Sequence, residues 1–141
     1  MKPTKITICF LLVVSALALS SCSSSSSNPA SAGEVVVVGG DLMNHTGLEG
    51  TILKADLLFD GSVIASASFT QPSLYATLTG TLTSVKSGSH TVEFRITSQS
   101  SSPNTYDVIG ATVNAGTSAY NLGNETASLA TGQSISYTVS F

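Results

Sequence analysis

The stretch that decides the fold is Leu53-Lys54-Ala55-Asp56-Leu57-Leu58-Phe59-Asp60-Gly61-Ser62-Val63-Ile64-Ala65-Ser66-Ala67-Ser68-Phe69. Apolar and polar side chains alternate on both sides of its central Asp60-Gly61. A period of two is typical of strands that bury one face, and Asp-Gly commonly joins two antiparallel strands. The stretch therefore predicts a β-hairpin.

The register of this hairpin depends on the length of its loop. A two-residue loop at Asp60-Gly61 would pair Phe59 with Ser62 and place the apolar residues of one strand beside serines of the other. A three-residue loop, with Gly61 in the left-handed conformation and a bulge, brings apolar residues together instead. We expect the three-residue loop. The pairs that it predicts are Leu57 with Val63 and Ala55 with Ala65.

The same alternation recurs at roughly ten-residue spacing through the rest of the chain, as in antiparallel sandwiches. Gly39-Gly40 is expected to end the first strand, and residues 41–50 to form a loop with at most a short strand around Leu42. Gly80 falls on an apolar strand face, where we expect a bend or a close approach of the backbone. The predicted strands are 35–38, 51–59, 62–70, 73–85, 90–97, 106–113 and 135–141.

No window shows a sustained 3.6-residue period, so the sequence predicts an all-β protein. Residues 34–141 are expected to form one antiparallel β-sandwich of about seven to nine strands. The hairpin of residues 57–64 and the later Ser87-Gly88-Ser89-His90-Thr91-Val92 resemble bacterial immunoglobulin-like and fibronectin-III-like modules. The resemblance covers about 40 residues and implies an immunoglobulin-like sandwich. The buried Trp and inter-sheet disulfide of antibody domains are absent, which excludes an antibody-type domain.

The N-terminal residues have the three parts of an export signal. Lys2 and Lys5 are followed by an apolar segment at 6–19 and by the small residues Ser20 and Ser21. The apolar segment is shorter than the roughly 20 residues of a membrane-spanning helix. An ordinary signal peptide cleaved near Ala18 or Ser20 and a retained anchor are alternative interpretations. Neither explains why a cysteine follows directly.

Leu19-Ser20-Ser21-Cys22 resembles the lipobox of bacterial lipoprotein precursors. The resemblance implies cleavage after Ser21 and a diacylglycerol thioether on Cys22, often with acylation of the new amino terminus. Two or three acyl chains hold a protein in a bilayer, whereas one chain does so only marginally. Ser23, in place of an aspartate, resembles cargo sorted to the outer membrane of Gram-negative bacteria. We therefore expect a signal peptide at 1–21 and an exported, membrane-anchored product.

Residues 23–33 are expected to be a disordered tether, because serine, alanine, asparagine, proline and glycine offer little apolar surface to bury. Such a chain has a root-mean-square span of roughly 18 Å and a contour of about 40 Å. Cys9 would leave with the signal, so Cys22 would be the one cysteine of the mature chain. Neither an intrachain disulfide nor a cysteine-based metal site is then possible.

The charge balance argues against nucleic-acid binding. All eight Asp and Glu lie beyond Cys22, with only Lys54, Lys86 and Arg95 as cations, which makes 3 − 8 = −5 for the mature chain. Three scattered cations form no basic patch that would neutralise phosphates.

We expect no catalytic residue, metal or cofactor. His45 and His90 are the only histidines, and no Ser-His-Asp spacing or His-x-x-x-His pair surrounds them. His90 is expected to pack or hydrogen-bond at a strand start. Asp56 and Asp60 lack the dense ligand spacing of calcium loops. An enzyme would need a cleft that gathers one histidine with an acidic partner.

The sequence thus predicts a membrane-anchored cell-envelope lipoprotein whose non-catalytic domain serves as an interaction or structural module, with sheet edges as candidates for strand addition. The alternative is a surface carbohydrate-binding module, which a contiguous patch of exposed tyrosines would favour. The partner would be an envelope protein or a glycan. Tyr75, Tyr106 and Tyr120 are expected to be the freer aromatics. The aromatics expected on core faces are Phe59, Phe69, Phe94, Tyr137 and Phe141.

Overall fold

The computed structural model describes residues 33–45, 52–70, 75–100 and 103–141. The expected signal peptide, Cys22, and all of the tether but Gly33 lie outside the described residues. Eight strands make up the described part. They are β1 (Glu34–Asn44), β2 (Ile52–Phe59), β3 (Ser62–Thr70), β4 (Tyr75–Val85), β5 (Ser89–Gln99), β6 (Asn104–Ala115), β7 (Ser118–Leu129) and β8 (Ser134–Ser140).

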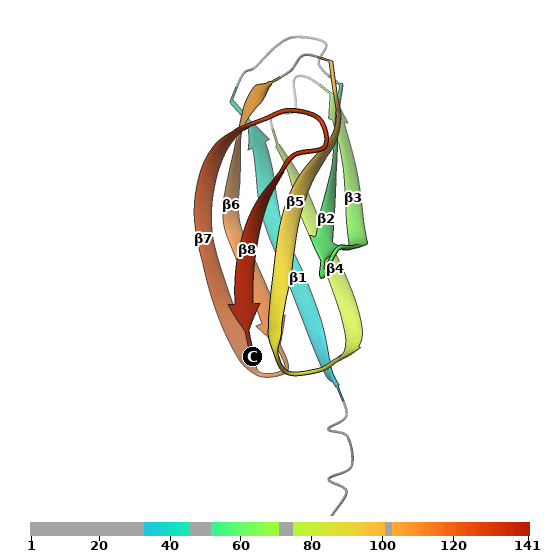
Figure 1. Ribbon diagram of the computed structural model, residues 1–141, viewed down its shortest axis with the longest axis vertical. Coiled ribbons are helices and arrows are strands. Elements are labelled where there is room, and N and C mark those ends of the chain that lie inside the picture. Colours follow the sequence, from blue (N-terminus) through green and yellow to red (C-terminus); the bar gives the residue numbers. More distant parts are fainter. Residues whose placement is uncertain (1–32, 46–51, 71–74, 101–102) are drawn as a thin grey trace, which may run out of the picture.

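The strands form two four-stranded sheets packed face to face (Figure 1). The order is β4-β1-β6-β7 in one sheet and β3-β2-β5-β8 in the other. Every pair of neighbours is antiparallel. The predicted antiparallel β-sandwich of seven to nine strands is therefore confirmed, with eight.

The inward faces of both sheets form one continuous core. Its largest fully buried side chains include Tyr106 and Phe94, one from each sheet. Period-two alternation places these residues inward, and the removal of their apolar surface from water stabilises the sandwich. The expected core aromatics follow this pattern: Phe59, Phe69 and Phe94 are buried, and Tyr137 and Phe141 pack against the core.

The register of the first hairpin differs from the prediction. Asp60 and Gly61 form a two-residue turn in which both have positive φ, +48° and +77°, and Phe59 pairs with Ser62. The extra residue that reconciles the two apolar faces lies in β3, where the register shifts around Ile64. The hairpin therefore contains a bulge, as predicted, but the bulge lies in β3 and not in the loop. The observed pairs are Leu57 with Ala65 and Ala55 with Ala67, in place of those expected.

Contrary to the prediction, Gly39-Gly40 does not end the first strand. β1 continues through both glycines to Asn44, in the middle of its sheet between β4 and β6. A Cβ added to Gly40 would lie 2.8 Å from the Phe94 ring of the opposite sheet. The glycine is therefore required by packing, because it makes room for the fully buried Phe94 ring of the facing sheet.

Gly80 confirms the expected close approach. It lies on β4, and a Cβ added there would fall within 2.9 Å of three side-chain atoms of Ile64 on β3. These two strands are the edges of their sheets on the same side of the sandwich. Their contact therefore closes that side.

β7 was not predicted. Its partly buried apolar residues lie at Tyr120 and Leu122 and then at Ala127, with Leu129 buried, so the inward positions change from even to odd numbers. The pairing of β7 with β6 shifts register near Gly123, which produces this change. An interrupted alternation does not stand out as a strand signal in the sequence.

Candidate functional site

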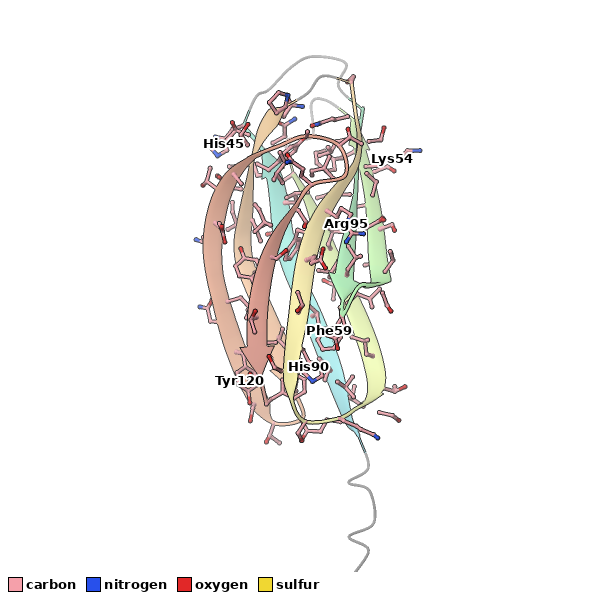
Figure 2. All side chains as sticks on the ribbon, viewed as in Figure 1. His45, Lys54, Phe59, His90, Arg95 and Tyr120 are labelled. Carbon is pink, nitrogen blue, oxygen red and sulfur yellow. The ribbon has the colours of Figure 1, made fainter. Side chains whose placement is uncertain are left out.

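The candidate lipidation site, Cys22, lies outside the described residues, so its position relative to the sandwich is not part of the structure. The first strand begins at Glu34 at the same end of the sandwich as Phe141 (Figure 1). His90, Phe59 and Tyr120 lie toward this end, and His45 lies toward the other (Figure 2). The two histidines therefore belong to separate sites.

His90 lies between two aromatic rings. Its ring centroid is 4.9 Å from that of Phe59 and 4.7 Å from that of Phe141, with interplanar angles of 26° and 23°. Its Nδ1 is 2.8 Å from Oδ2 of Asp60, and its Nε2 is 2.9 Å from the carbonyl oxygen of Lys86. The expected packing and hydrogen-bonding position of His90 at a strand start is confirmed.

Both ring nitrogens of His90 therefore have an oxygen partner, the Asp60 carboxylate on one side and the Lys86 carbonyl on the other. Burial raises the pKa of Asp60, but hydrogen bonds from His90 and from the Thr91 amide, together with the charge of His90, outweigh burial and leave the pKa below its ordinary value. Both nitrogens are engaged, which leaves neither free to take a proton from a substrate.

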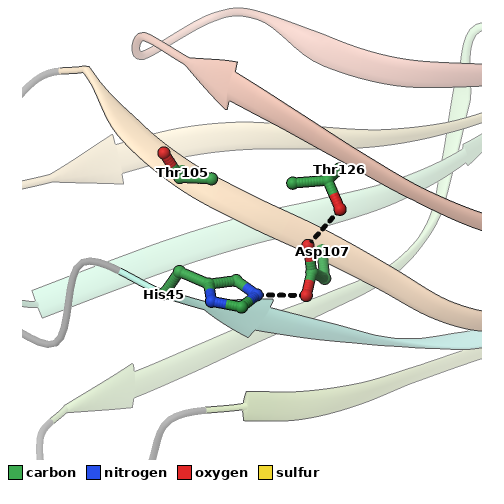
Figure 3. A pocket seen from close by; sticks show the side chains of 4 residues that line it. All are labelled: His45, Thr105, Asp107 and Thr126. Carbon is green, nitrogen blue, oxygen red and sulfur yellow. Dashed lines mark hydrogen bonds and ion pairs between the residues drawn. The ribbon is translucent and has the colours of Figure 1, made fainter.

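His45 lies at the opposite end, in an open cavity of about 310 Å³ that Thr105, Asp107 and Thr126 also line (Figure 3). Its Nε2 bonds Oδ2 of Asp107, and the hydroxyl of Thr126 donates to Oδ1 of the same carboxylate over 2.5 Å. The Thr126 and His45 bonds hold the pKa of Asp107 below its ordinary value, against a smaller effect of burial. The carboxylate is thus fixed between β1, β6 and β7.

This cluster contains the histidine and acidic partner that an enzyme would need, but it lacks the order of a catalytic triad. In a triad the hydroxyl bonds the histidine, whereas Thr126 bonds the carboxylate. Among the described residues, no nucleophilic side chain bonds the His45 ring. Asp107 and Thr126 were not singled out from the sequence, because 62 and 81 positions separate them from His45, and the strand pairing alone brings them together.

A shallow groove of about 360 Å³ runs along the outer face of β4, β1 and β6. Gly39 and Gly40 lie along it, and Asp41 lies at its side, where the Thr77 hydroxyl donates to Oδ1 over 2.6 Å. The rest of the lining is made of Val37, Thr79, Ile109, Gly110, Thr112 and Asn114. The groove presents hydroxyl, amide and carboxylate groups without an aromatic ring in its lining.

The tyrosines do not gather on one surface. Tyr106 is fully buried, which corrects the expectation that it is free, and its hydroxyl donates to Oε1 of Gln99 over 2.6 Å. Tyr120 is half-buried and packs against Phe141. Tyr75 is 58% exposed. Within the described ranges, no contiguous patch of exposed tyrosines exists.

No family model, curated protein or solved structure matches the chain. In the part of the chain that the structure describes, no group of three or more His, Cys, Asp or Glu is arranged to hold a metal ion. A search of the same residues finds no helix long and apolar enough to cross a membrane. The site therefore has to be interpreted from its own geometry.

Proposed function

We propose that this protein is a cell-envelope lipoprotein that is anchored through lipid on Cys22 and presents a non-catalytic, immunoglobulin-like sandwich as an interaction or structural module. The observation that carries the proposal is the lipobox Leu19-Ser20-Ser21-Cys22, directly behind a positive segment and an apolar segment of signal length. The outer membrane is the proposed location in a Gram-negative host.

The shape of the sandwich supports this proposal. β1 begins at one end of the long axis (Figure 1), so a tether joined there would present the other end and both outer faces away from the membrane. The anchored end is braced by the His90 stack and by the backbone pair between Gly88 and Phe141. A braced end at the tether, with the outer faces of both sheets exposed, suits a module that contacts other envelope components.

The non-catalytic part of the proposal is supported by the two histidines. His90 uses both ring nitrogens in structural bonds. His45 is held by a carboxylate that Thr126 also bonds, without a bonded nucleophile among the described residues. A histidine and a carboxylate without a bonded nucleophile are more typical of a structural hydrogen-bonded cluster than of a hydrolytic site.

Carbohydrate binding has less support. Stacking of sugars needs exposed aromatic rings, and Tyr75 is the one large aromatic exposed on the described surface. The shallow groove on β4, β1 and β6, which Asp41 helps to line, could hydrogen-bond a hydroxyl-rich ligand, but its lining contains no aromatic ring for stacking. The interaction module is therefore our first proposal.

The anchor is tested by the mass of the mature protein and by two cysteine variants. Lipidation predicts a mature chain that begins at a diacylglyceryl-modified Cys22. Cys22→Ala should release the protein from membranes with the sandwich still folded, whereas Cys9→Ala, which changes only the apolar segment, should remain anchored. An unmodified mature chain that begins elsewhere, or a Cys22→Ala protein that survives a carbonate wash on the membrane, would contradict the proposal.

The partner is tested by crosslinking in intact cells followed by identification of the bound proteins, and by a glycan array. Specific capture of an envelope protein supports the interaction module. Binding to a defined glycan that is lost in Asp41→Ala would favour the carbohydrate-binding alternative.

A further inference from the structure

The sandwich has four edge strands, β3, β4, β7 and β8, and three of them are irregular. β3 has the bulge at Ile64, β4 shifts register against β1 near Ser84, and β7 shifts near Gly123. Irregular edges resist the addition of a further strand. β8 is different, because it pairs with β5 from Ser134 to Ser140 without a shift and contains no charged residue, proline or glycine.

The free backbone groups of β8 can be assigned. Phe141 and Gly88 exchange two backbone hydrogen bonds of 3.1 and 2.7 Å, and Gln133 accepts one from Ile96. In an antiparallel ladder such pairs recur every second residue, so the odd-numbered residues of β8 direct their N–H and C=O groups at β5. The groups that face away belong to Ser134, Ser136, Thr138 and Ser140. Among the described strands, only β5 pairs with β8.

The sequence of β8 is self-complementary. Ser-Ile-Ser-Tyr-Thr-Val-Ser reads almost the same in both directions about Tyr137. Two such strands, antiparallel and centred on Tyr137, place Ser136 opposite Thr138 and Ile135 opposite Val139. In that register each copy offers four outward N–H donors, all opposite outward carbonyls, which allows eight hydrogen bonds. β8 itself brings no charged side chain to this interface, and Ser136, Thr138 and Ser140 are exposed with short side chains.

We propose that two copies of this protein pair through β8, with a two-fold axis at Tyr137, and join their sheets into one continuous sheet of eight strands. A two-fold interface needs one surface that complements itself, and the symmetric β8 edge satisfies this condition. The partner is therefore a second copy. This inference goes beyond the lipid anchor and does not rest on it.

Antiparallel pairing has a consequence for the whole molecule. β1 begins at the same end of the sandwich as Phe141 (Figure 1). A two-fold axis at Tyr137 therefore places the Glu34 ends of the two copies at opposite ends of the pair. Two anchored copies would lie along one membrane or would join two facing membranes.

The test uses a soluble chain that begins at Gly33. Every buried core residue of the described part lies between Val36 and Val139, so this chain keeps that core. Sedimentation equilibrium over a concentration series is expected to show a monomer–dimer equilibrium. Ser136→Lys should weaken the dimer about tenfold or more, because a lysine would be held at the centre of the paired edge. Ser68→Lys adds the same charge at an exposed position of the far edge strand β3 and should leave the dimer unchanged.

A second variant separates pairing from folding. Ser136→Pro removes an N–H that faces away from β5, so each sandwich should keep its circular dichroism spectrum while the dimer weakens. A short bis-maleimide should join two Thr138→Cys chains and should not join two Ser68→Cys chains. A chain that remains monomeric at every concentration would overturn the proposal. So would a dimer that Ser68→Lys weakens and Ser136→Lys leaves intact.

Discussion

Nδ1 of His90 lies 2.8 Å from Oδ2 of Asp60, although 30 residues separate the two in the chain. The bond joins the turn between β2 and β3 to the start of β5. The Thr91 amide donates to the other oxygen of the same carboxylate over 2.9 Å, and the Asp60 amide donates to the Thr91 carbonyl. One aspartate therefore shapes a tight turn, fastens it to the neighbouring strand and orients the histidine.

This relationship predicts how acid affects stability. The pKa of Asp60 is below its ordinary value in the folded state, so its contribution to the free energy of unfolding is fully present above the unfolded pKa of about 3.9 and is lost as the pH falls through the folded pKa. Asp60→Asn should be less stable than the wild type at pH 6, and the difference should narrow below about pH 4. Urea unfolding of both proteins at pH 6, 4 and 3 measures this difference in the free energy of unfolding.

Asp56→Asn is the control for this experiment, because Asp56 lies on the same hairpin and bonds a serine in place of a histidine. If Asp60→Asn and the wild type lost stability in parallel between pH 6 and 3, the bond to His90 would not stabilise the fold.

Two tyrosines are expected to respond in opposite directions to the loss of their hydroxyls. Burial, with a smaller effect of the Glu125 charge, raises the pKa of Tyr137 to about 12, and its buried hydroxyl has no hydrogen-bond partner among the described residues. Tyr137→Phe should raise the free energy of unfolding by about 1 kcal/mol, because an unsatisfied polar group is removed. Tyr106→Phe should lower it by about 1 kcal/mol, because Gln99 loses a donor. Chemical denaturation of both variants tests the contrast, and a loss of stability in Tyr137→Phe would contradict it.

The contact between Gly40 and Phe94 predicts a steric conflict and its relief. In Gly40→Ala the new Cβ would lie 2.8 Å from the Phe94 ring and 3.2 Å from the Ala111 Cα, which should lower the free energy of unfolding by about 1–3 kcal/mol. Phe94→Leu should lower the free energy of unfolding by less in the Gly40→Ala background than in the wild type, because the smaller side chain makes room for the new Cβ. Thermal unfolding of both single variants and of the double variant tests this, and strictly additive effects would contradict it.

The hairpin turn predicts a graded response at Gly61. Its φ of +77° is unfavourable for residues with a Cβ, and asparagine tolerates this region better than alanine does. Gly61→Ala should lower the free energy of unfolding by about 1 kcal/mol, and Gly61→Asn by about half as much. No atom lies within 4 Å of a Cβ placed at this glycine, so the difference reports backbone conformation and not crowding. Equal losses in both variants would indicate a different turn.

The alternation of side chains was sufficient to predict an all-β sandwich, most strands and five aromatics of the core, but not the buried position of Tyr106. It was insufficient wherever the register slips by one residue. The bulge at Ile64 and the register shift near Gly123 exchange inward for outward positions along their strands. For this reason the predicted register of the first hairpin was wrong and β7 was not predicted. The sequence predicts a strand end at Gly39-Gly40, whereas both glycines lie within β1 and Gly40 makes room for the Phe94 ring of the opposite sheet.

The sequence by itself determined the candidate anchor and the class of fold, because a lipobox-like motif and a period of two are local patterns that need no partner elsewhere in the chain. Tertiary structure alone decided that Asp60 meets His90 and that Asp107 meets His45, since these contacts depend on which strands lie side by side. It also decided which strands are edges. The symmetric residues of β8 therefore became a candidate interface only once the sheet order left that strand with one neighbour.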